Sequence, residues 1–182
     1  AGWIGGLNAI VILSRVLKPD YGLAFLFALF LLCTFVSAGF AAPSSFIAEV
    51  VAVLSGDSIK VLKSRQVMIV DLQGIDAPEK EQQYGQQAKD FTESIAFGQK
   101  VVVNLRGVDK NDHIVAEVVR EDGTSLNREI GKAGFAWWAR EHSEDLSLWR
   151  LEDKAREAKL GLWLGEDPVP PWEFRETMGV VP

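Results

Sequence analysis

The chain has 182 residues, 48% of them hydrophobic, and a formal net charge of −6 at pH 7, so it can bury one sizeable core with a segment left over. Cys33 is the only cysteine, which excludes an intrachain disulfide and a thiolate metal site. From Pro43 onward there are 17 Lys and Arg against 24 Asp and Glu. This acidic balance argues against nucleic-acid binding, because the affinity for nucleic acid comes largely from neutralising phosphates. A local basic patch is compatible with the overall charge.

An apolar run of 21 residues without a charge, residues 22–42, precedes the charged part of the chain. As a helix rising about 1.5 Å per residue it would be roughly 31 Å long, enough to cross the hydrocarbon of a bilayer. Arg15 and Lys18 stand just before it. We therefore expect a single-pass helix in the inner (cytoplasmic) membrane, with a cytoplasmic N-terminus and a periplasmic C-terminal domain. A cleaved signal peptide is the alternative, because residues 36–38 and 39–41 would both serve as small-residue cleavage sites.

The segment ahead of that run, residues 1–21, contains the apolar stretch WIGGLNAIVIL. It is too short to span a bilayer and too apolar for water, which predicts an interfacial or re-entrant helix, or a patch packed on a partner protein. An extended apolar tail lying in lipid would also satisfy it. The predicted partners are therefore membrane lipid around 22–42 and proteins of a membrane complex that contact 1–21.

A folded domain is predicted beyond a short linker, residues 43–45. In chain order, β-branched runs, helical periodicity and turn signals predict strands at 46–54, 57–62 and 67–73, a helix at 83–97, strands at 100–106 and 113–119, and helices at about 125–134 and 144–160. Pro168, Pro170 and Pro171 indicate a tail. The predicted fold is mainly β with added α: a closed five-stranded OB-type barrel with three helices, preceded by the transmembrane helix.

Carboxylates stand at the ends of these predicted strands. Asp57 lies in the turn SGDS, Asp76 and Glu79 lie in GIDAPE, and Asp71 interrupts the apolar run of the third strand. Each turn by itself is an ordinary one, because Asp commonly accepts hydrogen bonds from its own backbone there. The two turns indicate a functional site only when they are considered together with other segments of the sequence.

Seven segments in one order carry a resemblance to a known family. SGDSIKV, GIDAPE, QQYGQQAKDF, VAEVV, LNREIGKAGFAWW, AREAKLGLW and VPPWEF resemble the staphylococcal-nuclease-like (thermonuclease) family in order and spacing. The resemblance covers about residues 46–175 and leaves 176–182 as a C-terminal tail. It implies the OB-type fold and a calcium-dependent nuclease site.

The resemblance also assigns the residues of that site. Calcium would be held by Asp57, Asp76 and the backbone carbonyl of Ala77, while Glu79 would act as general base on the attacking water. Such a set suits calcium, which takes several hard and partly anionic oxygens, and a metal ion assists phosphodiester hydrolysis by neutralising charge. Asp71 adds a fourth acid to the region and is a further candidate ligand, as is Glu79. A cation is expected among the four acids; solvent-facing acids without an ion are the alternative.

The two arginines that hold the scissile phosphate in that family are replaced here. The resemblance puts Asp71 at the first position, on the third strand, and His113 at the second, where the family's D-[RK]-Y-G-R pattern reads DKNDH. Losing one preorganised donor typically costs about two to three orders of magnitude in rate, and a carboxylate facing phosphate adds repulsion of ~1–4 kcal/mol. Arg65 and Arg106 lie at the wrong strand positions to replace them. We expect Asp71 and His113 to be non-functional in catalysis.

Three functions follow. The favoured one is an inactive nuclease homologue, an accessory or structural subunit of a larger membrane complex, because the phosphate-binding arginines are absent, the domain is acidic and the N-terminus is more apolar than an anchor needs. The alternative is a calcium-dependent nuclease acting on DNA or RNA outside the cytoplasm. The third is a module that binds nucleic acid or oligosaccharide without chemistry.

Overall fold

The computed structural model describes residues 44–179. The predicted segments at 1–21 and 22–42 lie outside this range. Within the described range, no helix combines the length and the apolar character that a membrane crossing requires.

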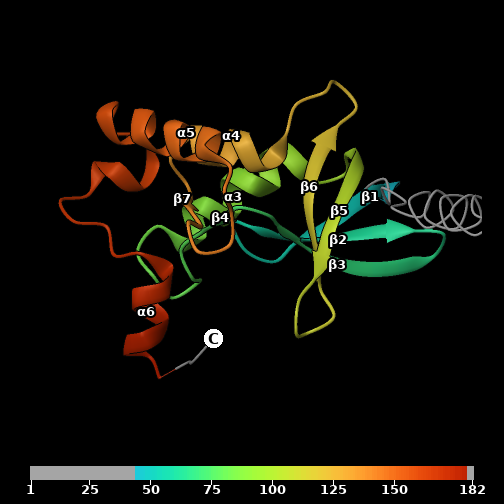
Figure 1. The fold of residues 1–182 in the computed structure, drawn as a ribbon, viewed down its shortest axis with the longest axis horizontal. Helices are drawn as coiled ribbons and strands as arrows, with labels where there is room; N and C mark the ends of the chain where they lie inside the picture. Colours follow the sequence, from blue (N-terminus) through green and yellow to red (C-terminus); the bar gives the residue numbers. More distant parts are fainter. Residues whose placement is uncertain (1–43, 180–182) are drawn as a thin grey trace, which may run out of the picture. The chain divides into compact units, whose positions relative to one another are not determined.

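Five strands close into a barrel, in the order β1-β2-β3-β6-β5 (Figure 1). Their bounds are β1 Ser45–Val53, β2 Ser58–Lys63, β3 Gln66–Leu72, β5 Lys100–Val108 and β6 Ile114–Arg120. All neighbours in the barrel pair antiparallel except β3 and β6, which are parallel. The predicted five-stranded barrel is thus confirmed, with strand ends within two residues of those expected.

The barrel core is built by the alternation of the strands. Inward-facing side chains of all five strands are fully buried, including Val50, Ile59, Val61, Val70, Val103 and Val118. β-Branched residues suit this role because they pack well on a pleated, half-buried surface. The β-branched runs that predict the strands therefore also supply the residues that fill the core.

Four α-helices accompany the barrel in residues 44–179: α3 Gly85–Ala96, α4 Leu126–Lys132, α5 Leu146–Glu157 and α6 Pro171–Thr177, with a short 3-10 turn, η2 Gly161–Leu164. The sequence predicts only the first three. The prediction of a tail at the prolines is wrong at Pro171, which is the first residue of α6. Proline is well tolerated there, because the first backbone N–H of a helix has no intrahelical partner to lose.

A second, two-stranded sheet links the barrel to the helices. It consists of β4, Ile75–Asp76, paired antiparallel with β7, Trp137–Trp138. In the view of Figure 1, α6 lies on the other side of this pair from α4 and α5. The small sheet fixes the GIDAPE turn in place, since β4 contains Asp76.

Candidate active site

The SGDS and GIDAPE turns meet in the structure. The Asp57 carboxylate accepts hydrogen bonds from the Ser55 hydroxyl at 2.7 Å and from the backbone N–H of Ala77 at 2.9 Å. Gly56 makes this approach possible, because a Cβ on it would lie 2.6 Å from the Cβ of Ala77, well inside van der Waals contact. The two motifs that the sequence singles out therefore form one structural unit.

Asp57 is held in an environment that disfavours its negative charge. Burial of the carboxyl, followed by the negative charges of Asp76 and Asp71, raises its pKa to about 7. The hydrogen bonds from Ala77 and Ser55 oppose this rise without cancelling it. A carboxylate in this situation is stabilised by any cation that comes within reach.

Glu79 is positioned by the start of α3. Gly85, the first residue of that helix, packs so closely on the turn that a Cβ there would lie 1.9 Å from the carbonyl oxygen of Glu79. The Glu79 backbone N–H donates to the Gln82 side chain at 3.1 Å. The glycine of the QQYGQQ segment thus keeps the turn compact and leaves the Glu79 side chain 38% exposed.

Asp76 and Glu79 share one arginine from the far end of the chain. Arg175 in α6 donates to both carboxylate oxygens of Asp76, Nη2 to Oδ2 at 2.7 Å and Nη1 to Oδ1 at 3.2 Å, and its Nη1 also reaches Glu79 Oε1 at 2.7 Å. The hydrogen bond to Asp76, more than the one to Glu79, raises the pKa of the Arg175 guanidinium above its ordinary value. The sequence analysis did not single out Arg175, which stands just after the quoted VPPWEF segment.

Asp71 and His113, which the family resemblance places at the two arginine positions, pair with each other. Asp71 Oδ2 lies 3.0 Å from His113 Nδ1, and Asp71 Oδ1 accepts a hydrogen bond from the Ser58 hydroxyl at 2.5 Å. Parallel pairing of β3 with β6 places Asp71 opposite Val115, beside the loop that carries His113. Asp71 and His113 are therefore hydrogen-bond partners of each other, and neither offers a free positive charge to a ligand.

Asp109 joins this pair. Its carboxylate accepts the backbone N–H of His113 at 2.8 Å and lies 3.9 Å from the imidazole Nδ1. Among residues 44–179, the oxygens and imidazole nitrogen of Asp71, Asp109 and His113 lie within 4.8 Å of one another and could hold a metal ion. The sequence analysis did not single out Asp109; its spacing of four residues from His113 in DKNDH was the available signal.

The acids predicted to hold calcium fit that ion by donor type. Asp57, Asp76 and Glu79 supply hard carboxylate oxygens, which calcium prefers, and the pKa of Asp57 is raised by its burial first and by the neighbouring charges of Asp76 and Asp71 second. Each ionised carboxylate has about four lone-pair sites, so the hydrogen bonds to Ser55 and Ala77 leave ligand capacity at Asp57. At Asp76 each oxygen likewise accepts one hydrogen bond, but the donor is the positively charged guanidinium of Arg175.

A hollow of about 340 Å³ borders this region. Its walls include Asp71, Asp76, Asp109 and His142, and no Lys or Arg of residues 44–179 lines it. A phosphodiester entering it would meet carboxylates on several sides. The hollow has the size for a ligand and the wrong charge for a phosphate held without a metal.

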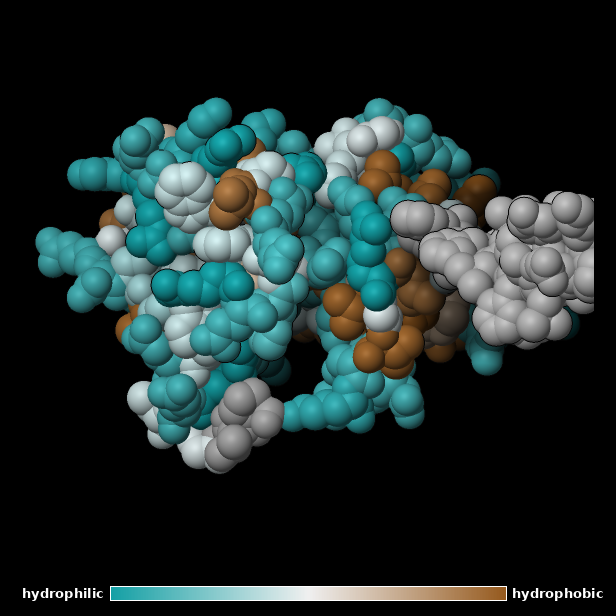
Figure 2. Space-filling view, viewed as in Figure 1, coloured by the Kyte–Doolittle hydropathy of each residue, from teal (hydrophilic) through white to brown (hydrophobic). Residues whose placement is uncertain are grey.

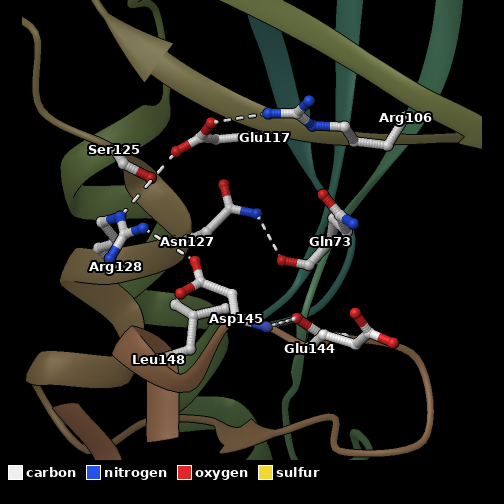
Figure 3. Close-up of a pocket in the computed structure, with 10 residues that line it drawn as sticks. Gln73, Arg106, Glu117, Ser125, Asn127, Arg128, Glu144, Asp145 and Leu148 are labelled. Atoms are coloured by element: carbon white, nitrogen blue, oxygen red, sulfur yellow. Dashed lines mark hydrogen bonds and ion pairs between the residues drawn. The ribbon is translucent and has the colours of Figure 1, made fainter. Parts of the chain in front are cut away.

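Arg106 lies in a different hollow, of similar size. Figure 3 shows it paired with Glu117, at 3.5 Å, while Arg128 contacts Asp145 at 2.9 Å. Arg65 sits in the β2–β3 turn and is exposed. The sequence analysis predicted that neither arginine could replace the missing ones. In the structure, neither Arg65 nor Arg106 lines the hollow beside Asp71.

Comparison with known proteins decides the family. A family described as "Staphylococcal nuclease homologue" matches residues 69–165. An "Uncharacterized endonuclease" of Escherichia coli is 40% identical over 127 residues, which cover 70% of this chain and 83% of that protein. A "Micrococcal nuclease" of Shigella flexneri is 32% identical over 142 residues, covering 72% and 82%. The chain belongs to the staphylococcal nuclease family.

Compared with the pattern of the staphylococcal nuclease family, the chain keeps one group of site residues and differs in another. The family resemblance assigns metal binding and general-base positions to Asp57, Asp76 and Glu79, and the structure holds these acids on the adjoining SGDS and GIDAPE turns. It assigns the phosphate-binding arginines to the positions of Asp71 and His113, which instead form a pair.

A "Protein ParB" of Escherichia coli, 34% identical over 137 residues, also matches this chain.

Proposed function

We propose that this chain is a calcium-binding member of the staphylococcal nuclease family that hydrolyses phosphodiesters far more slowly than members with both arginines. In this proposal it is held at the cytoplasmic membrane by residues 22–42, with its domain on the periplasmic side. There it serves as an accessory subunit of a larger membrane complex.

The observation that carries the proposal is the Asp71–His113 pair. The imidazole Nδ1 lies 3.0 Å from an Asp71 oxygen and 3.9 Å from an Asp109 oxygen, so its polar contacts are directed to acids. A planar guanidinium grips two phosphate oxygens at once, which an imidazole cannot do. Losing two such donors and gaining a carboxylate corresponds to a rate loss of about five orders of magnitude or more.

Exposed apolar residues on the barrel support the accessory role. On the face drawn in Figure 2, hydrophobic side chains gather over the barrel strands and the surface over the helices is mainly hydrophilic, although the helical part also exposes large apolar residues such as Leu146 and Leu164. Ile47, Val67 and Val108 of the barrel strands are 68%, 56% and 58% exposed. Contiguous exposed apolar surface is typical of protein or membrane contacts, which a subunit of a membrane complex would make.

The experiment uses the full chain extracted in mild detergent. We expect its cleavage of single-stranded DNA and RNA in millimolar calcium to stay close to that of a chelator-treated control, and the chain to purify within a multi-subunit assembly. Cleavage at the rate of an ordinary family nuclease would overturn the loss of catalysis. A chain that runs as a single subunit in detergent and co-purifies with nothing would overturn the accessory role.

A calcium-dependent nuclease anchored outside the cytoplasm is the second candidate. It is favoured by the retained Asp57, Asp76 and Glu79 and by the names of two relatives, an "Uncharacterized endonuclease" and a "Micrococcal nuclease". This candidate predicts chelator-sensitive cleavage that the substitution Glu79→Gln abolishes. Cleavage that survives this substitution would argue against it.

A further inference from the structure

Arg175 reaches the acidic turn from a helix distant in the sequence. Its guanidinium makes three hydrogen bonds to Asp76 and Glu79, which lie 99 and 96 residues earlier in the chain. The Arg175 side chain is only 28% exposed. The contact is therefore a part-buried junction between α6 and the metal-binding turn.

Packing around α6 fixes this junction. The ring of Trp172 lies edge-on to Trp137 with centroids 6.5 Å apart, and the guanidinium of Arg140 lies 5.5 Å from the centre of the Trp172 ring. The buried Gln82 side chain donates to the Val169 carbonyl just ahead of the helix. Arg175 is thus delivered to Asp76 by a docked segment, residues 169–177, that we call the C-terminal strap.

We propose that Arg175 is an internal counter-ion that competes with a divalent cation for Asp76 and Glu79, so that calcium binding displaces the C-terminal strap. The inference rests on the proposed function, since it takes the calcium ligands from there. Both oxygens of Asp76 accept from the guanidinium, so a calcium ion bound to the same carboxylate would lie close to a positive charge. A monovalent and a divalent cation on one acid pair repel each other, and the effect is strong where solvent screening is reduced.

The competition has two consequences for this chain. Removing the guanidinium frees Asp76 and Glu79 and leaves their charge uncompensated, so calcium should bind more tightly. Bound calcium in turn neutralises the carboxylates of Asp76 and Glu79 and weakens their attraction for Arg175, so the C-terminal strap should detach more often. Reciprocal effects of this kind are required by linkage between two binding events.

The first test measures calcium binding by titration calorimetry on the full chain in mild detergent. Arg175→Gln should bind calcium at least tenfold more tightly than the unmodified chain. Arg150→Gln is the matched control, because Arg150 is exposed on α5 and its loss changes the net charge equally. An affinity of Arg175→Gln equal to that of the control, or weaker, would overturn the inference.

The second test needs no variant. Amide hydrogen exchange of residues 172–178 in the unmodified chain should become faster on addition of calcium, while barrel amides such as those of β2 and β3 should not. Unchanged or slower exchange in the strap would overturn the inference.

These outcomes separate the inference from the proposed function. Rapid DNA cleavage by the unmodified chain would defeat the proposed loss of catalysis and leave the calorimetric comparison standing. Calcium binding by the unmodified chain with no effect of Arg175→Gln would defeat the inference alone. Failure of both chains to bind calcium would overturn the inference together with the calcium site of the proposed function.

Discussion

Asp71 and Asp76 both border the same hollow, yet their negative charges are compensated in different ways. Asp76 is paired with an arginine, which stays charged at every physiological pH, and that arginine comes from the far end of the chain. Asp71 is paired with a histidine from the loop just before the neighbouring strand β6. The acids that would bind metal are thus paired with a guanidinium, and the acid at the position that would bind phosphate is paired with an imidazole.

The largest effect should come from converting the Asp71–His113 pair into the family's two arginines. The double substitution Asp71→Arg and His113→Arg should raise calcium-dependent cleavage of single-stranded DNA by about two orders of magnitude or more, because each preorganised donor contributes roughly that much. Initial rates on the full chain measure it. Asp71→Asn with His113→Gln is the control, since it removes the pair without adding positive charge.

No gain in the double arginine variant over this control would mean that the acids predicted to bind metal are also incompetent. A comparable gain in the control would show that the negative charge of Asp71, and not the absence of the arginines, had prevented cleavage.

Asp57, one of the acids predicted to bind metal, should make stability depend on pH. Its pKa is about 7 in the folded protein, against 3.8 for an unperturbed Asp, so the folded state binds this proton more tightly than the unfolded state. Unfolding then releases the proton between about pH 4 and pH 7, and the contribution of Asp57 to stability falls as pH rises through that window. The loss is up to ~4 kcal/mol, at about 1.4 kcal/mol for each pH unit.

Denaturant unfolding of the full chain at pH 4 and pH 8 measures this term, with Asp57→Asn as comparison. The variant should become more stable relative to the unmodified chain as pH increases. A difference that stays constant with pH would contradict the raised pKa.

Removing Arg175 should destabilise the protein in the absence of calcium. The substitution Arg175→Gln leaves the part-buried Asp76 and Glu79 without their charged donor, which corresponds to about 1–3 kcal/mol of unfolding free energy. Chemical denaturation in chelator measures the loss. Arg150→Gln should stay within about 0.5 kcal/mol of the unmodified chain, and equal effects of the two substitutions would show that the junction adds nothing.

The smallest effect should come from neutralising Asp71. The side chains of Asp71 and His113 are 35% and 30% exposed, so solvent screens the pair and Asp71→Asn should change the unfolding free energy by about 0–1 kcal/mol. Chemical denaturation at pH 6 and pH 8 measures it. A loss of several kcal/mol would mean that the Asp71–His113 pair is structural, like the Arg175 junction.

The barrel was accessible from the sequence because its signal is local. Strands at 46–54 and 67–73 were predicted from β-branched runs bounded by turn signals, and the structure places β1 and β3 within one residue of those bounds. The two acidic turns were also predicted as one site, through the family resemblance. Their meeting depends on Gly56, whose missing side chain lets Ala77 approach.

The remaining features were not accessible because their signals are short or distant. The strands β4 and β7 have two residues each, too few for a periodic pattern. The prolines before α6 indicated a tail, although proline also suits the first position of a helix. The pairing of Arg175 with Asp76 spans 99 residues, and no local pattern in the chain encodes such a contact.

The position of Arg175 late in the chain has a consequence for synthesis. The barrel and the acidic turn leave the ribosome before α6 does, because Arg175 follows Asp76 by 99 residues. Asp76 and Glu79 therefore spend that interval without their guanidinium. A nascent chain that meets calcium during this interval can have its acids occupied by the ion first, so the ionic conditions of the compartment would decide which cation completes the domain.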